Sequence, residues 1–390
     1  MLKLENEKLT QQRIKAIHLK QIYLLALKKG TISRQQVRQA LRLSPPSSSA
    51  LVDELLERGV LAENGLSEAS GRGRPSIALQ IRSSHFVIPV ISLTADGFDA
   101  FLFDVRTNLL EQTHLFLDFS QSVHSDGVTR LPPEVFSAPL LQWLDAVKRR
   151  WTPLILLLSL SGSIADGYFS SSAFQFYVPD RFVSILEKEG RLPVLVGNTA
   201  SYFAYGEKQY HPDDPDFIYL FIDDGVGAGI LHNGLIFGDG LMWAGEIGHI
   251  SIDCQGRPCI CGGRGCLEQY VSIPAIVRDA GMSFSQVCDS FQAGEENAVA
   301  LITEKAVQLA VGINNALTMH PTEHIIIGGK ITDLGDSFLS ILAQQIRTVG
   351  MRRRMDHVSV EFAANNHHGD VFGALWNYIE HTLEIDDITE

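Results

Sequence analysis

The sequence predicts an α/β protein in which a small basic helical module precedes a larger acidic body. Length indicates more than one core, because 390 residues exceed what one ordinary domain holds. Charge separates the parts: residues 1–82 carry 14 Lys and Arg against 7 Asp and Glu, a balance of +7, whereas the whole chain carries −13. After residue 82, strand-like apolar runs alternate with helical periodicity. We expect domains at 1–82, 83–200 and 201–390.

Composition and cysteine usage favour a cytoplasmic protein. The chain is 45% hydrophobic and 20% charged, which is typical of globular proteins. Its longest apolar run, 154–160, is far too short to span a membrane, and residues 1–20 contain no apolar signal segment. Five cysteines is an odd number, and three of them lie within 259–266, which is unlike a disulfide framework. We therefore expect a reducing compartment and no direct membrane insertion.

Three helices are expected in the first 60 residues. Aliphatic spacing predicts a helix over 13–29, including Ile14 and Ile17 on its periodic face. A capping-box pattern of a serine and a glutamine three residues later predicts a second helix starting at Ser33. Serine followed by proline predicts a third helix over 45–58.

Two short strands, at 60–61 and 77–81, flank the sequence Gly-Arg-Gly-Arg-Pro over 71–75. Three helices followed by such a hairpin predict a winged helix-turn-helix, whose last helix enters the major groove of DNA. Its small polar residues would begin base or phosphate contacts, and the guanidinium groups of the wing would reach the minor groove. The expected DNA-binding residues are Ser47, Ser48, Ser49, Arg72 and Arg74. A helical module that binds another protein is the alternative.

The body shows one pattern twice. Strands are expected at 86–93, 98–105 and 109–117, then helix 134–150, strand 154–160, helix 180–189 and strand 193–197. A second round begins near residue 217 with two strands, continues largely as helix to 320, and reaches a strand at 325–327. This duplication resembles the ribonuclease-H-like fold of actin and sugar kinases, in which ligands bind between two lobes.

One histidine and three cysteines lie within 18 residues of each other, namely His249, Cys259, Cys261 and Cys266. A Cys₃His set is a common structural zinc complement in which the protein fills all four positions. A closed site leaves no place for a catalytic water, so we predict structural Zn²⁺. Reduced cysteines without metal are the alternative. Cys254 and Cys288 fall outside this pattern and are expected to be small core residues.

The strings Gly-Glu-Ile-Gly-His at 245–249 and Cys-X-Cys-Gly-X-X-Gly-Cys-Leu-Glu at 259–268 resemble the ROK family of repressors, open reading frames and sugar kinases. With its N-terminal module, the chain is most similar to the Mlc/NagC group of sugar-responsive repressors. The resemblance implies that sugar hydroxyls are held by Asn198, Glu246, His249 and Glu268, and that His249 also binds zinc. Alternatively, the two glutamates only cap or hydrogen-bond the zinc loop.

The same resemblance implies that kinase chemistry is lost. ROK kinases carry Asn-Asp at the catalytic step, where this chain has Asn198 and Thr199, and a threonine hydroxyl is no general base at neutral pH. The first phosphate loop, normally Asp-X-Gly-X-Thr, corresponds to the unrelated residues 92–96. The second contains Asp223 and Asp224, which repel ATP phosphates. We therefore expect that the chain is not an enzyme. A divergent ROK sugar kinase with a regulatory DNA-binding head is the alternative.

Together these features predict a repressor of sugar uptake and utilisation genes that binds double-stranded operator DNA as a homodimer or tetramer. By resemblance, release would follow binding of a sugar, a sugar phosphate or a permease domain of the sugar phosphotransferase system. A protein-binding hub without operator preference is a third interpretation. Near the C-terminus, His367 and His368 are expected at the surface. Apolar residues at helical spacing there predict a helix whose apolar face belongs to the core or to a dimer interface: Val371, Phe372, Leu375, Trp376, Ile379 and Leu383.

Overall fold

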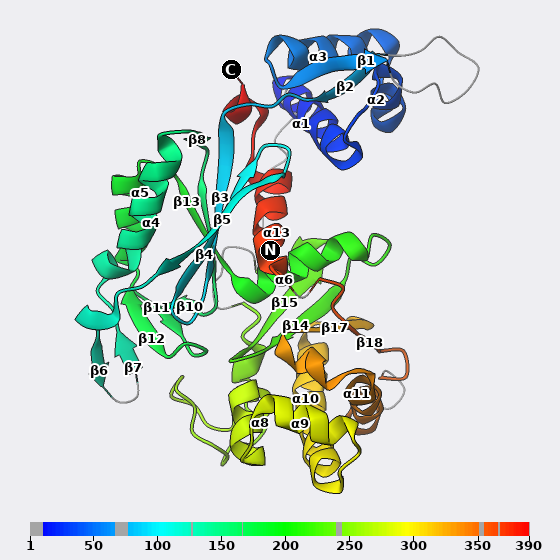
Figure 1. Ribbon diagram of the computed structural model, residues 1–390. Coiled ribbons are helices and arrows are strands. Elements are labelled where there is room, and N and C mark those ends of the chain that lie inside the picture. The colour runs from blue at the N-terminus through cyan, green and yellow to red at the C-terminus, as the bar shows by residue number, and fades with distance from the viewer. Residues whose placement is uncertain are drawn as a thin grey trace.

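The structure, a computed structural model, consists of a small helical head and two α/β lobes (Figure 1). It describes residues 11–66, 77–125, 128–165, 167–238, 244–350, 355–365 and 367–389. The head lies at one end of the molecule, beside the first lobe, and the second lobe lies at the other end. No helix within these described ranges is long and apolar enough to cross a membrane.

The head contains the three predicted helices and a two-stranded antiparallel sheet. The helices are α1 (Gln11–Lys29), α2 (Arg34–Leu41) and α3 (Pro45–Glu57), and the strands are β1 (Leu61–Leu66) and β2 (Ile77–Ile81). Both halves of the predicted capping box at Ser33 are formed, and the Ser44 hydroxyl caps α3. These local signals decided where the helices begin. Arg72 and Arg74 lie outside the described residues.

The buried side of α1 does not coincide with the aliphatic residues whose spacing predicts the helix. Leu19, Ile22 and Tyr23 are buried, whereas Ile14 and Ile17 are 39% and 42% exposed. The first two turns of α1 are exposed throughout, although Lys15 pairs with Glu54 of α3 there at 2.7 Å. The aliphatic spacing thus located the helix correctly, although not every residue that defines this spacing is buried.

The first lobe is built on a mixed sheet whose main order is β13-β9-β3-β4-β5. Strands β3 and β4 pair antiparallel, as do β4 and β5, whereas β9 is parallel to both β3 and β13. The strands are β3 (Phe86–Leu93), β4 (Gly97–Asp104), β5 (Leu109–Phe116), β9 (Leu156–Leu160) and β13 (Val194–Asn198), with helices α4 (Pro133–Lys148) and α5 (Arg181–Gly190). All seven elements confirm predictions.

The second lobe repeats this topology. Its sheet has the order β16-β15-β14-β17-β18, so that both sheets have the order third-second-first-fourth-fifth with the second strand antiparallel to its neighbours. This repetition confirms the predicted duplication. Its strands are β14 (Phe217–Ile222), β15 (Val226–His232), β16 (Leu235–Ile236), β17 (His324–Gly328) and β18 (Ser359–Phe362). Its helices are α7 (Glu268–Val271), α8 (Ile273–Ala280), α9 (Phe284–Gln292), α10 (Glu296–Met319) and α11 (Asp336–Val349).

Two helices pack against each other where the lobes meet, α6 (Thr199–Glu207) and α13 (Gly369–Asn377). A Cβ atom at Gly206 would lie 2.3 Å from the Gly369 carbonyl oxygen, and one at Gly373 would lie 1.7 Å from the Tyr202 carbonyl oxygen. Glycines at these positions therefore allow the helix backbones to touch. The expected domain boundary after residue 200 falls inside α6, and α13 also contacts β3 and β9 of the first lobe. The division into three domains stays a prediction.

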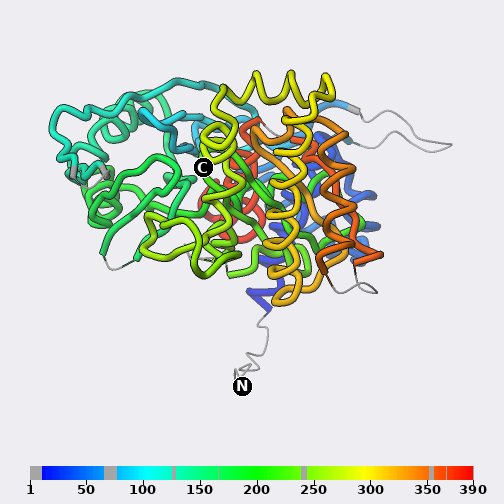
Figure 2. Tube along the Cα trace, turned by 90° about the horizontal axis from the view of Figure 1, so that it is seen from below, coloured from blue at the N-terminus to red at the C-terminus, as the bar shows by residue number. Residues whose placement is uncertain are grey.

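The predicted C-terminal apolar stripe belongs to the core. Val371, Leu375, Ile379 and Leu383 are at most 1% exposed, while Phe372 at the edge is 37% exposed. Figure 2 shows this red C-terminal segment in the middle of the molecule.

The head is attached to the body by apolar packing and by polar contacts. One continuous cluster of buried side chains extends from Leu19 in α1 to Ile388 in the short helix η6 (Ile385–Ile388). The Tyr23 hydroxyl donates a hydrogen bond of 2.5 Å to the Val105 carbonyl oxygen. In addition, Arg58 pairs with Asp386 of the C-terminal segment. The head is therefore packed directly on the first lobe.

Candidate functional site

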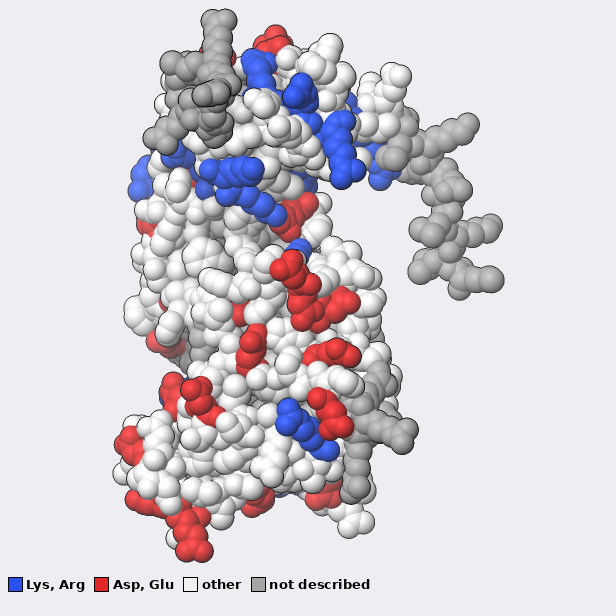
Figure 3. Space-filling view, turned by 90° about the vertical axis from the view of Figure 1, so that its right-hand side faces the viewer, with Lys and Arg blue, Asp and Glu red and all other residues white. Residues whose placement is uncertain are grey.

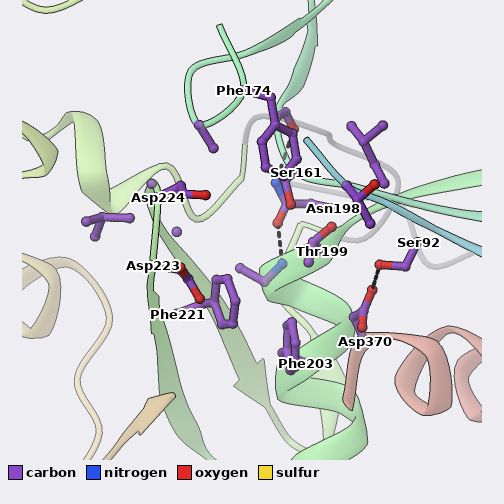
Figure 4. A pocket seen from close by; sticks show the side chains of 18 of the residues that line it. Ser92, Ser161, Phe174, Asn198, Thr199, Phe203, Phe221, Asp223, Asp224 and Asp370 are labelled. Carbon is purple, nitrogen blue, oxygen red and sulfur yellow. Dashed lines mark hydrogen bonds between the residues drawn. The ribbon is translucent and has the colours of Figure 1, made fainter. Parts of the chain in front are cut away.

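A cavity of 450 Å³ opens where the two lobes face each other (Figure 4). Its walls come from the ends of β3 and β13, the start of α6, the β14–β15 turn and the start of α13. Its polar lining includes Ser92, Asn198, Thr199, Asp223, Asp224, Glu246, Glu268 and Asp370. The carboxyl ends of parallel strands and helix N-termini therefore meet here, as in ligand clefts of other α/β proteins.

Asn198 is held in a fixed orientation on the cavity wall. It ends β13 and caps α6, because its Oδ1 accepts hydrogen bonds from the backbone N–H groups of Ala200 at 2.9 Å and Ser201 at 3.4 Å. Its Nδ2 donates to the Gly162 carbonyl oxygen at 3.2 Å. An amide nitrogen has two hydrogens, so one donor remains for a ligand.

Two carboxylates face the same cavity. Glu268 is 5% exposed, and its Oε2 accepts hydrogen bonds from the Val226 N–H at 3.0 Å and the Ser172 hydroxyl at 3.3 Å. Burial raises the pKa of Glu246 to about 7, and the negative charge of Glu268 contributes in the same direction. Asn198, Glu246 and Glu268 are thus brought together, as the sequence predicts. His249 instead lines an adjacent cavity of 120 Å³, which Glu246 also lines.

The cysteine-rich loop brings its four predicted donors into one cluster. The Sγ atom of Cys259 lies 3.6 Å from Nδ1 of His249, and the Sγ atoms of Cys261 and Cys266 lie 3.6 Å apart. All four donor atoms lie within 4.8 Å of one another. Tetrahedral zinc with Zn–S bonds of about 2.3 Å separates two sulfurs by about 3.8 Å. The donor set and its spacing therefore fit a metal ion.

The loop needs glycine at its tightest point. Gly265 has a φ of +70°, and a Cβ atom there would lie 1.7 Å from the Asp253 carbonyl oxygen. Of the remaining cysteines, Cys288 is buried as predicted. Cys254 is exposed, so its expected core position is wrong, because it lies in an open turn of this loop.

The cluster and the cleft share a contact. His249 directs Nδ1 toward the cysteines, and its Nε2 lies 3.6 Å from Oε2 of Glu246. Gln269 donates to the Cys259 sulfur at 3.7 Å. The 3.6 Å separation is longer than a hydrogen bond, so the Glu246 carboxyl group lies beside the second nitrogen of His249 without being hydrogen-bonded to it. A metal here would fix the orientation of His249, which borders Glu246 on the cleft wall.

No carboxylate occupies the position of the kinase base. Thr199 is 7% exposed, and its hydroxyl lies 2.9 Å from the hydroxyl of Ser159. Across the cleft, burial raises the pKa of Asp223, and the charge of Asp224 adds to this effect. Two carboxyl groups at the second phosphate loop disfavour a nucleotide triphosphate unless a cation intervenes.

Sequence reasoning missed Asp370, which lies near the start of α13 and is entirely buried. Its Oδ2 accepts hydrogen bonds from the hydroxyls of Ser92 and Ser159, each at 2.7 Å. Ser92 stands where the kinase resemblance places the first Asp of the phosphate loop. A carboxyl group is therefore present in this part of the cleft, but it comes from Asp370 at the start of α13 and not from the residue at position 92. The neighbouring His367 and His368 are exposed, as expected, although they also line the cavity.

The face of the head seen in Figure 3 is basic. In Figure 3 Lys and Arg gather over the head, whereas Asp and Glu dominate the body. Ser47 is exposed and Ser49 is partly exposed. Ser48 is only 2% exposed, and its hydroxyl donates to the Pro45 carbonyl oxygen. The predicted DNA contact of Ser48 is therefore wrong, because its side chain points inward.

Two further arginines belong to the basic surface of the head and were not singled out from the sequence. Arg38 and Arg42 are exposed at the end of α2, beside the turn that leads into α3. An Arg on the first helix of a helix-turn-helix is a standard position for a phosphate contact.

Comparisons with known proteins show which proteins the chain is similar to. The sequence profile of the ROK family matches residues 177–380, just over half of the chain. A xylose repressor from Caldicellulosiruptor bescii is 25% identical over 409 aligned residues, which cover 98% of this chain and 99% of that protein. A solved ROK family transcriptional regulator, a homologue of E. coli Mlc, has a TM-score of 0.76 and 23% identity, with 96% of this chain and 97% of that chain covered.

A ROK family glucokinase from Streptomyces griseus, solved with glucose and AMPPNP, matches 74% of this chain and 97% of its own, with a TM-score of 0.59 and 19% identity. It thus shares the two-lobed, sugar-kinase-like fold. On these grounds the chain belongs to the ROK family.

Proposed function

We propose that this chain is a cytoplasmic transcriptional repressor of sugar uptake and utilisation genes. Its head acts as a winged helix-turn-helix on double-stranded operator DNA, and a homodimer or tetramer places two heads on a pseudo-palindromic site. A sugar or sugar phosphate in the cleft relieves repression, and a permease domain of the sugar phosphotransferase system is the second candidate effector. The observation that carries the proposal is the continuous core that joins the basic head to a cleft lined by Asn198, Glu246 and Glu268.

The body supports binding without phosphoryl transfer. Asn198, Glu246 and Glu268 offer an amide and two carboxyl groups of the kind that hold sugar hydroxyls. Transfer to a sugar would need a base, and the Thr199 hydroxyl, paired with Ser159, does not supply one. We therefore infer that the chain is not a kinase. A coupled assay of ATP consumption with a panel of hexoses should stay at background; consumption with one hexose would favour a divergent kinase with a regulatory head.

We infer that Zn²⁺ is the resident metal of the cysteine cluster and that its role is structural. His249, Cys259, Cys261 and Cys266 would hold the ion with all four positions filled by protein. Bound zinc supplies a rigid anchor for the loop. His249 is then held in one orientation beside Glu246 on the cleft wall.

A path of direct contacts connects the cleft to the head. Asn198 caps the N-terminus of α6, and Tyr205 near the other end donates a hydrogen bond of 2.5 Å to Glu380. Glu380 also pairs with Lys28 of α1 at 3.0 Å. An effector that binds one position of α6 better than another would therefore change the contact with the head, which is the requirement for ligand-driven release.

The proposal is tested by selecting genomic DNA fragments with the purified full-length protein at near-physiological salt, with and without hexoses and hexose phosphates. We expect enrichment of a palindromic site upstream of sugar uptake genes, and loss of this enrichment with one sugar. The Glu268→Gln variant should keep the site but ignore the sugar, whereas the exposed control Glu187→Gln should respond like wild type. Indifference to all sugars would point to the protein effector, and absence of any enriched site would contradict the repressor.

A further inference from the structure

A second cluster of metal-ligating side chains lies in the second lobe, away from the cysteine loop. It contains His211, after the short helix η2 (Lys208–Tyr210), His324, which opens β17, and Glu361 in β18. Oε1 of Glu361 lies 2.8 Å from Nε2 of His324 and 3.5 Å from Nδ1 of His211. One donor atom from each residue lies within 4.8 Å of the others.

These separations are close to those of a metal site. Nitrogen and oxygen ligands at about 2.0–2.1 Å from tetrahedral zinc lie about 3.3 Å from each other. The observed 2.8 Å and 3.5 Å lie on either side of this value. Adjustment of the Glu361 carboxylate by a few tenths of an ångström would bring both into range, and that side chain is 48% exposed and able to move.

Both histidines are already oriented as metal ligands are. His324 contacts Asp214 through Nδ1 at 2.8 Å, and His211 contacts Glu207 through Nε2 at 3.3 Å. Each imidazole thus turns one nitrogen to the common centre and the other to a carboxylate, as in carboxylate–histidine–metal arrangements. The buried ring of Phe217 packs against both imidazoles, with ring centroids 5.7 Å and 6.0 Å away.

The charge of the cluster also favours a cation. Three carboxylates, from Glu207, Asp214 and Glu361, surround the two imidazoles. With both histidines neutral, the cluster carries three negative charges, which a divalent cation partly offsets. The exposed Glu361 gives an ion access from solvent and leaves the remaining coordination position to water.

We propose that His211, His324 and Glu361 form a second divalent-metal site, independent of the cysteine cluster. Two imidazoles and one carboxylate suit Zn²⁺, for which Co²⁺ is a spectroscopic substitute. The bound ion joins η2, which continues from α6, to two strands of the second-lobe sheet. Glu207 extends this connection, because its carboxylate also accepts hydrogen bonds from the backbone N–H groups of Ala364 and Asn365, just before α13.

Cobalt titration of the metal-free full-length protein tests this site. Wild type should bind two Co²⁺ ions, of which only the one at the cysteines produces thiolate-to-cobalt charge-transfer absorption. His324→Gln should lose one ion and keep the charge-transfer band, whereas Cys259→Ser should weaken that band and keep the other ion. The control His357→Gln, an exposed histidine of the same lobe, should bind two ions.

Glu361→Gln is the second variant, because its exposed side chain can be changed without loss of the fold, which circular dichroism verifies. It should also lose the ion that gives no charge-transfer band. A single Co²⁺ in wild type, or two ions in both His324→Gln and Glu361→Gln, would overturn the proposal and leave the cluster as an ion-pair network.

Discussion

The carboxyl group of Asp370 is enclosed by the protein, and burial raises its pKa above the ordinary value of 3.8. The native state therefore binds this proton more tightly than the unfolded state, so the contribution of Asp370 to stability falls as pH rises. We expect the stability of wild type relative to Asp370→Asn to fall by about 1.4 kcal/mol per pH unit between pH 3.8 and the raised pKa. Urea unfolding at a series of pH values measures this difference. The exposed control Asp145→Asn should follow wild type, and a constant difference for Asp370→Asn would contradict the assignment.

Arg38 is exposed on α2 beside the turn into α3, where a phosphate contact is expected. Arg38→Ala should weaken binding to all DNA sequences alike and reduce the slope of log affinity against log salt by about 0.9, the value for one phosphate. Fluorescence anisotropy with operator and unrelated duplexes provides the measurement. Arg149→Ala, an exposed change on the body, should leave the slope unaltered. An unchanged slope for Arg38→Ala would remove this residue from the interface.

Whether the residues of a site could be predicted from the sequence depended on how far apart they lie along the chain. The cysteine cluster was predictable because three of its donors lie within eight positions. The bonds from Ser92 and Ser159 to Asp370 span 278 and 211 positions, and no local pattern records such contacts. Exposure was equally invisible: Ser47 and Ser48 are chemically identical, and only the packing of α3 turns one outward and the other inward.

Among the elements, α6 connects the cleft to the contact between Glu380 and Lys28. We expect Tyr205→Phe to keep operator affinity but to weaken the effector response, because the hydrogen bond from α6 to Glu380 is removed and only the 3.4 Å contact from Lys208 remains. Couplings of this kind change affinity by about 5–150-fold, so the loss is measurable in DNA-binding titrations with and without effector. Tyr210→Phe, at an exposed tyrosine, is the control. A full response in Tyr205→Phe would show that the signal takes another route.

The cysteine loop is the second element that the proposal connects to the cleft. Cys259→Ser should lose one zinc ion per chain and weaken effector binding, because His249, which borders Glu246, would no longer be fixed in orientation. Elemental analysis and effector titration measure the two effects. The exposed Cys254→Ser should keep both properties. Metal content equal to that of wild type would contradict the ligand assignment.

Element prediction succeeded where the segments are long or carry cap residues, as in α2 and the five main strands of the first lobe. It missed a small sheet of the first lobe with the order β10-β11-β12-β7-β6. These strands are only three or four residues long: Ser163–Ala165, Tyr168–Ser171, Phe176–Pro179, Val128–Arg130 and Val123–Ser125. Alternation of polar and apolar residues needs a longer segment before it can be recognised.

For the whole molecule, the charge balance of the sequence correctly predicted a basic head on an acidic body (Figure 3). It could not predict how the two are joined. The head core, the last residues of the chain and one side of both lobe sheets share one apolar cluster, whereas each lobe also has a second cluster of its own. The sequence around the junction does not reveal this, because the body residues that α1 contacts lie far away along the chain, at Val105 and in η6.

The shared cluster has a consequence for heat denaturation. Since Leu19 and Ile388 belong to one core, the head should not melt separately, as a domain on a free linker would. Scanning calorimetry should show one transition that includes head and first lobe. A chain shortened to end at Leu383 should lower the melting temperature of that transition and loosen the DNA-binding surface, although the deletion is far from that surface in sequence. An early, separate head transition in the full chain would contradict this expectation. The last seven residues thus stabilise a domain at the opposite end of the chain.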